Sequence, residues 1–215
     1  MENKNLIIVA VAVVAIAVIL GAIFATGVLN KTDERTTTSF SNAFMEGAFT
    51  GNVKLANNSS DFMQSYEDSE HLITYNISTV DNSTALMDIY YVQGVTNPEH
   101  RSYNGNDWNI YFTQAIQGND TNKTMNIIIC QSQGEKQGYL IYMIIDSKTD
   151  LQVSGNAFGE PYKSYIEPLL KSLTLKESSN VPAINEEFGL SESEFAQQME
   201  LIHQYKAGNT SALQG

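Results

Sequence analysis

Asn-x-Ser/Thr triplets are the residues of this chain whose types and spacing point most specifically to one chemistry, the attachment of N-linked glycans. Glycans need exposed acceptors, and Asn76 is expected on the polar face of a strand while Asn119 and Asn122 lie in a polar stretch. Several used acceptors would place this part of the chain outside the cytoplasm. The eight triplets begin at Asn30, Asn57, Asn58, Asn76, Asn82, Asn119, Asn122 and Asn209.

Motifs of known catalytic or cofactor sites do not occur in the sequence. It contains no GxSxG, GxGxxG, P-loop, HExxH or CxxC pattern. Its three histidines, His71, His100 and His203, are scattered along the chain. We therefore predict no catalytic residue, no metal ligand and no cofactor-binding residue.

Two acidic groups and one cysteine are candidate sites for which a structural role is the expected one. Residues 67–71 (EDSEH) could ligate a metal, but their spacing matches no known site, so a solvated acidic loop is expected. Residues 146–150 (DSKTD) lack the glycine and the distal glutamate of a calcium loop and are interpreted as a turn. Cys130 ends an apolar run and is expected to be buried as a small hydrophobic side chain.

Residues 6–29 form an uncharged apolar run that is expected to anchor the chain in a membrane. As a helix the run would be about 36 Å long, and a hydrocarbon core is about 30 Å thick. A cleaved signal peptide is the alternative, but its apolar region is usually about 7–15 residues long, and no good cleavage site follows here. The few basic residues that flank the run do not decide the orientation of the helix in the membrane. The glycan acceptors indicate it instead: residues 1–5 are expected in the cytoplasm and the chain after the helix outside the cell.

Small residues at a spacing of four, Ala17, Gly21 and Ala25, lie on one face of this predicted membrane helix. Such a stripe lets two helices approach closely, and it also arises by chance in an Ala-rich span. A homodimer through this face is one expectation. The net charge of −12 lies outside the helix and repels phosphate backbones, so nucleic acid is not an expected partner.

The remaining chain divides into a polar stalk (30–39), a domain (40–176), a linker (177–189), and a C-terminal helix with a polar tail (190–215). Apolar residues at helical spacing over 162–173 predict a helix that kinks or restarts at Pro168. Alternating or continuous apolar residues predict strands at 48–55, 72–79, 86–92, 108–113, 127–130, 139–145 and 151–158.

The runs at 127–130 and 139–145 are apolar at consecutive positions, which predicts strands covered on both faces. The expected fold is therefore α+β, an antiparallel sheet with helices on both faces. Ser191 and Glu194 match a capping box that would begin the last helix. Its narrow apolar stripe of Phe195, Met199 and Ile202 would pack on its own domain or dock a partner.

Two stretches resemble PsbP/Mog1-type domains. FTGNVKLANNSSDF (49–62) is similar to their opening strand and loop, and YKSYIEPLLKSLTLK (162–176) is similar to their closing helix. The resemblance covers roughly residues 40–176 and departs at Ala56 and Asn57, where a proline and an aromatic residue are common. It implies an α/β/α sandwich and a non-catalytic binding or assembly module, with no functional residue carried over. The anchor, stalk and glycan acceptors also resemble small surface proteins of methanogenic archaea.

The sequence thus favours a non-catalytic, membrane-anchored domain outside the cell that binds or scaffolds a protein or a cell-surface polysaccharide. An accessory subunit of a membrane complex, docking through the last helix, is the alternative. An enzyme with an unrecognised site is a third reading.

Overall fold

The structure is a computed structural model that describes residues 36–57, 59–116, 124–148 and 159–213. Its strands are β1 (Thr37–Ser41), β2 (Met45–Thr50), β3 (Lys54–Leu55), β4 (Met63–Asp68), β5 (Ile73–Val80), β6 (Glu99–Tyr103), β7 (Asn106–Ile116), β8 (Thr124–Gln133), β9 (Gly138–Ile145) and β10 (Thr174–Leu175). Its helices are α2 (Ser83–Val92), the π-helical turn η1 (Tyr162–Ile166), α3 (Glu167–Ser172), α4 (Ile184–Glu187), α5 (Glu192–Lys206) and the 3-10 turn η2 (Thr210–Leu213).

Seven strands form the central sheet in the order β3-β4-β5-β9-β8-β7-β6, and every neighbouring pair is antiparallel. The predicted strands around residues 127–130 and 139–145 are confirmed as β8 and β9, which form a hairpin. All eight residues of β9 are buried. This double-sided burial agrees with the continuous apolar pattern and requires a layer on each face.

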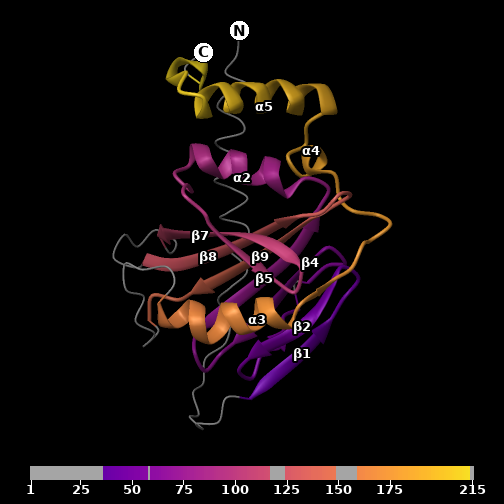
Figure 1. The fold of residues 1–215 in the computed structure, drawn as a ribbon, viewed down its shortest axis with the longest axis vertical. Coiled ribbons are helices and arrows are strands. Elements are labelled where there is room, and N and C mark those ends of the chain that lie inside the picture. Colours follow the sequence, from indigo (N-terminus) through magenta and orange to yellow (C-terminus); the bar gives the residue numbers. More distant parts are fainter. Residues whose placement is uncertain (1–35, 58, 117–123, 149–158, 214–215) are drawn as a thin grey trace.

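The layers are stacked in an order that Figure 1 shows clearly. On one face of the central sheet lie α2 and α4, and α5 covers α2 as an outer layer. On the other face lie η1 and α3 beside a small antiparallel sheet of order β1-β2-β10. The predicted α+β class with antiparallel strands is therefore confirmed. The expected single sheet is wrong in detail, because a second sheet shares the α3 face.

Each face of the central sheet has its own hydrophobic core. Odd-numbered residues of β5 and β9, such as Tyr75 and Met143, pack under α3 and the small sheet. Even-numbered residues of β9, such as Leu140 and Tyr142, pack under α2 and α4. The two-residue period of a strand therefore assigns each side chain to one core or the other.

Residues 86–92 were expected to form a strand and instead lie in α2, so that prediction is wrong. Asn82 caps the helix, its side-chain oxygen accepting from the backbone N–H of Ala85 at 2.9 Å. Leu86, Ile89 and Tyr90 recur at helical spacing on its buried face. A short run that is apolar at almost every position fits a strand and a helix equally well, so its periodicity over seven residues did not distinguish the two.

Two further expectations about strands need correction. The strand expected over 48–55 is divided into β2 and β3 at Gly51, whose φ is +105°. No strand was expected immediately before residue 108, but Glu99–Tyr103 form β6, which pairs with β7 in a hairpin that turns at Asn104 and Gly105, both with positive φ. The sequence did not indicate β6 because its residues are polar and, apart from Tyr103, exposed, as is common at the edge of a sheet.

The ends of the expected domain were also placed wrongly. Residues 37–39 belong to β1 and not to a stalk. The expected linker contains α4, whose buried Ile184 and neighbouring Phe188 complete the core beneath α2. Domain, linker and last helix are therefore packed together.

Local signals at the two C-terminal helices were predicted correctly. A π-helical turn passes into α3 next to Pro168, so the helix does restart there. The capping box is formed at α5: the Ser191 hydroxyl accepts from the Glu194 backbone N–H, and the Glu194 carboxylate accepts from the Ser191 backbone N–H.

The predicted anchor at 6–29, its small-residue stripe and the strand expected at 151–158 lie outside the described residues. Within the residues that the structure does describe, no helix combines the length and the apolar character that a membrane crossing requires.

Candidate functional site

A pocket with a volume of about 300 Å³ lies on the α2 face of the central sheet, beside α4 and the start of β4. Pockets of this size are at the lower end of those that hold small molecules. No pattern in the sequence indicates this pocket, because its walls come from segments far apart in the chain. It is lined by Ser60, Phe62, Met63, Ser78, Thr79, Val80, Leu86, Tyr90, Leu140, Tyr142, Pro182, Ile184, Glu187 and Phe188.

Strand register explains the hollow. Ser78 of β5 lies directly between Met63 of β4 and Leu140 of β9. Directly opposed residues share a face of the sheet, so a short side chain stands there between two long ones. On the helix above, Leu86 and Tyr90 are four residues apart and project from one side of α2. The small side chain of Ser78 leaves the space that these residues enclose.

Two of the lining residues, Tyr90 and Tyr142, carry hydroxyl groups, and these two groups are neighbours. The hydroxyl oxygens of Tyr90 and Tyr142 lie 3.4 Å apart, and the residues are 1% and 5% exposed. Burial raises the pKa of Tyr142 well above its usual value and also raises that of Tyr90, so both hydroxyls are protonated at neutral pH. Since their separation is long for a hydroxyl pair, both keep capacity for a further hydrogen bond.

The electrostatics of the pocket disfavour an anion. Among its lining residues the only charged side chain is Glu187, which is exposed. No lysine, arginine or histidine belongs to the described lining. A buried carboxylate or phosphate would therefore find hydroxyl groups but no cation to offset the cost of its desolvation.

A buried polar pair continues from the pocket along the same face. Asn76 is paired with Tyr142 across β5 and β9, and its side-chain oxygen accepts from the Ser65 hydroxyl at 2.6 Å. Asn76 is only 3% exposed. The expectation that it lies on a solvated strand face is therefore wrong, because the layer that covers β5 also covers this amide.

The other glycan acceptors divide into two groups. Asn57, Asn82 and Asn209 are exposed. The Asn82 side-chain oxygen caps α2, which leaves its amide nitrogen free of that bond. The remaining candidates lie outside the described residues, at Asn30, Asn58, Asn119 and Asn122.

The proposed docking stripe of the last helix is occupied within the chain. Met199 and Ile202 are 8% and 3% exposed and belong to the core beneath and around α2. Phe195 is half-buried, and its ring stacks with Phe188 at a centroid distance of 6.2 Å. Of the two alternatives, packing on its own domain and docking a partner, the structure shows the first for Met199 and Ile202.

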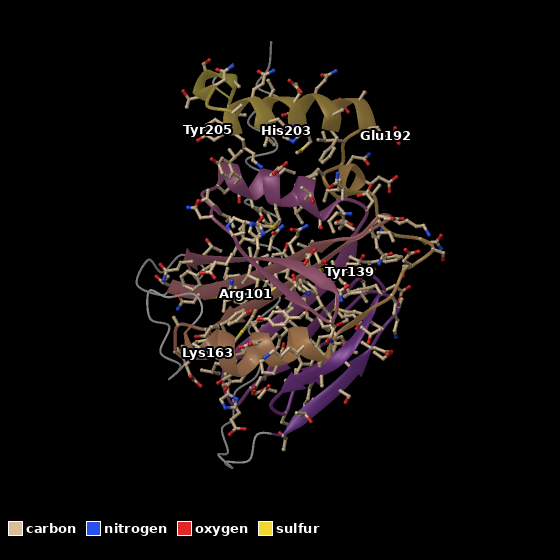
Figure 2. The ribbon with its side chains drawn as sticks, viewed as in Figure 1. Arg101, Tyr139, Lys163, Glu192, His203 and Tyr205 are labelled. Atoms are coloured by element: carbon tan, nitrogen blue, oxygen red, sulfur yellow. The ribbon has the colours of Figure 1, made fainter. Side chains whose placement is uncertain are left out.

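Polar contacts hold the same helix in place. His203 of α5 points toward α2 (Figure 2), and its Nε2 lies 3.1 Å from an Asp88 carboxylate oxygen. Lys206 contacts the other oxygen of Asp88 and also lies over the ring of Tyr91, with its Nζ 5.3 Å from the ring centroid.

The acidic group at 67–71 is not the solvated loop that was expected. Asp68 is 1% exposed, and its carboxylate accepts from the backbone N–H groups of Glu70 and His71. It also lies 2.8 Å from His71 Nδ1. Asp68 is thus a buried carboxylate that caps the turn, while Ser69 of the same group is exposed. Among the described residues no three His, Cys, Asp or Glu side chains are placed to hold a metal ion.

Cys130 lies in the core under α3, as expected for a small hydrophobic side chain. Burial raises the pKa of its thiol, which keeps it protonated and unreactive at neutral pH. Asp146, at the end of β9, accepts from the backbone N–H of Lys148, which fits the predicted turn as far as residue 148.

Comparison with known proteins gave no match to a family model and none to a curated protein. Two solved structures are similar. One is a crystal structure from Bacteroides thetaiotaomicron, with a TM-score of 0.45, 5% identity and 68% of this chain covered; this chain spans 51% of that one. The other is the solution structure of cyanobacterial PsbP (CyanoP) from Synechocystis, with a TM-score of 0.41, 10% identity and coverage of 70% of this chain and 98% of that one. PsbP, the family that the two sequence stretches resemble, is thus among the structures to which this chain is similar.

Proposed function

We propose that this chain is a non-catalytic binding domain, held at a membrane by residues 6–29 and facing the exterior. The observation that carries the binding function is the pocket between α2, α4 and the sheet. It combines an apolar wall with two buried hydroxyl groups that keep hydrogen-bonding capacity. Its described lining pairs no nucleophile with a base, so the arrangement suits recognition of a molecule better than its conversion.

The exterior location is supported by surface chemistry. Asn57, Asn82 and Asn209 are exposed and can accept glycans, and the chain carries a net charge of −12. A scaffolding role in which the domain holds a protein or a cell-surface polysaccharide is compatible with the same location. The finer assignment to a PsbP/Mog1-type domain of an archaeal surface protein is part of this proposal and is supported by residues 49–62 and 162–176.

Protease shaving of whole cells tests the location. Protease added outside intact cells of the native host should degrade the domain and leave an N-terminal fragment in the membrane. A cytoplasmic protein followed in the same sample should stay intact. A domain that is protected until the cells are lysed would overturn the proposed topology.

Native mass spectrometry tests the binding function. The full chain, released gently from native membranes, should carry a noncovalent small-molecule adduct that is lost when the protein unfolds. A chain without any adduct that instead converts a small molecule would favour the enzyme reading. The accessory-subunit reading loses its main support, because the stripe of α5 that would dock a partner packs on α2.

A further inference from the structure

We infer that the pocket takes one class of ligand, an uncharged molecule with an apolar body and a single hydroxyl or carbonyl group that bonds to the Tyr90–Tyr142 pair. This inference rests on the binding function proposed above and specifies its ligand.

Size limits the ligand first. A volume of about 300 Å³ equals roughly ten water volumes, so the part of a ligand that the pocket holds has about ten non-hydrogen atoms. The wall also includes Leu86, Leu140 and Phe188, which are 8%, 1% and 8% exposed and favour an apolar body.

The tyrosine hydroxyls set the polar requirement. They lie 3.4 Å apart, each has one donor hydrogen and two acceptor lone pairs, and each is nine-tenths or more buried. A ligand hydroxyl or carbonyl oxygen that lies beside the pair, within hydrogen-bond distance of both hydroxyls, would satisfy groups that the protein leaves weakly paired. A pure hydrocarbon would fill the space but leave this pair as it is, so it should bind less tightly.

Charge supplies the discrimination. Both hydroxyls remain protonated at neutral pH, and the only charged side chain of the described lining is the carboxylate of Glu187. A fatty acid of the same length would have to bury its carboxylate in a pocket whose described lining offers no cation to pair with it. The site should therefore select a neutral alcohol over the matching acid.

A photoactivatable octanol that carries a diazirine is a suitable probe, because octanol has about nine non-hydrogen atoms and so matches the volume. The full chain in liposomes is labelled by light, and mass spectrometry locates the modified residues. Position-specific labelling keeps the result independent of probe dissolved in the lipid. Expected sites are Tyr90, Tyr142 and their neighbours in the pocket, and octanol should compete at concentrations at least about a hundredfold below octanoate.

Variants separate the pocket from other apolar surfaces. Ser78→Phe places a ring in the space between Met63 and Leu140 and should abolish labelling. Tyr90→Phe with Tyr142→Phe keeps the shape and should weaken competition by octanol about fivefold, with competition by octane unchanged. Tyr205→Phe, on α5, is the matched control and should behave as the wild type.

Labelling outside the pocket, labelling that survives Ser78→Phe in a chain with a native circular dichroism spectrum, or octanoate that competes as well as octanol would overturn the inference. If Ser78→Phe does not fold, the isosteric double tyrosine variant decides it alone. Failure here leaves the protease and native-adduct results of the proposed function untouched. Protection of the domain from external protease, in turn, would overturn the proposed topology without changing the expected labelling of the pocket.

Discussion

Gly138, the first residue of β9, lies so close to Ser83, the first residue of α2, that a Cβ atom on the glycine would overlap the serine hydroxyl group. The Ser83 hydroxyl donates to the backbone oxygen of Ser132, and the Ser83 backbone N–H donates to the Gln133 side chain at 2.8 Å. The start of α2 is thus fixed to the β8–β9 hairpin. This contact sets where α2 lies over the sheet. It therefore positions Leu86 and Tyr90, which line one side of the pocket.

Replacing Gly138 with alanine should destabilise the fold by about 2–3 kcal/mol, because an added methyl group has no room against α2. Chemical denaturation of the full chain in mild detergent measures this, with fluorescence of the single, buried Trp108 as the signal. Ser83→Gly in the same chain removes the overlapping atoms and should restore part of the loss. Equal stability of Gly138→Ala and wild type would show that α2 does not approach the hairpin so closely.

The last helix should be held mainly by apolar burial and only slightly by its ion pairs. Ile202→Ala is expected to cost about 2–4 kcal/mol, because Ile202 is 3% exposed against α2. Asp88→Asn, which weakens the contacts to half-exposed His203 and Lys206, should cost about 1 kcal/mol or less.

Hydrogen exchange of the α5 amides reads out this difference, with Ala196→Ser on the exposed side of α5 as the control. Protection of the amides should fall strongly in Ile202→Ala and little in the other two variants. The opposite result would be that Ile202→Ala leaves the α5 amides protected, while a second protein no longer co-purifies with the chain from native membranes. That result would show that α5 docks a partner.

Glycan mapping should find a pattern set by burial and not by the triplet motif. Asn82 and Asn209 are expected to carry glycan in the native host, and Asn76 is not, because its amide is buried beside Ser65. Glycopeptide mass spectrometry measures occupancy at each position. Asn82→Gln should remove one glycan and also weaken the start of α2 by about 1 kcal/mol, since the cap is lost. Glycan on Asn76 would contradict the buried position of β5.

Alkaline pH should unfold the domain because several tyrosines are buried in their neutral form. Burial raises the pKa of Tyr66 to about 12 and that of Tyr75 well above the usual 10. The unfolded chain loses these protons first, so stability is fully present below pH 10 and falls as pH rises toward 12 and beyond. Tyrosinate absorbance followed together with circular dichroism should show ionisation and unfolding in one transition.

Tyr75→Phe provides a sharp test of the same argument. The Tyr75 hydroxyl is buried with no hydrogen-bond partner among the described residues, so its removal should be neutral or stabilising at pH 7. It should also move the onset of alkaline unfolding to higher pH. Loss of stability at neutral pH would instead indicate that the hydroxyl has a partner in the folded chain.

Local patterns in the sequence determined much of the secondary structure. The continuous apolar runs indicated β8 and β9, and the Ser191–Glu194 spacing indicated the start of α5. Pro168 indicated the break between η1 and α3. These predictions succeeded because each depends on hydrogen bonds or side-chain periodicity within a few residues. The segment at 86–92 failed because a short run that is apolar almost throughout fits a strand or a helix equally well.

Tertiary structure alone decided what surrounds each residue. It buried Asn76 and Asp68, which their polar character had placed in solvent, and it packed Met199 and Ile202 against α2 rather than leaving them for a partner. It also created the pocket, whose walls join Ser78 of β5, Tyr90 of α2 and Tyr142 of β9. Burial and pocket shape depend on contacts between segments far apart in the chain, and no local pattern encodes which segments will meet.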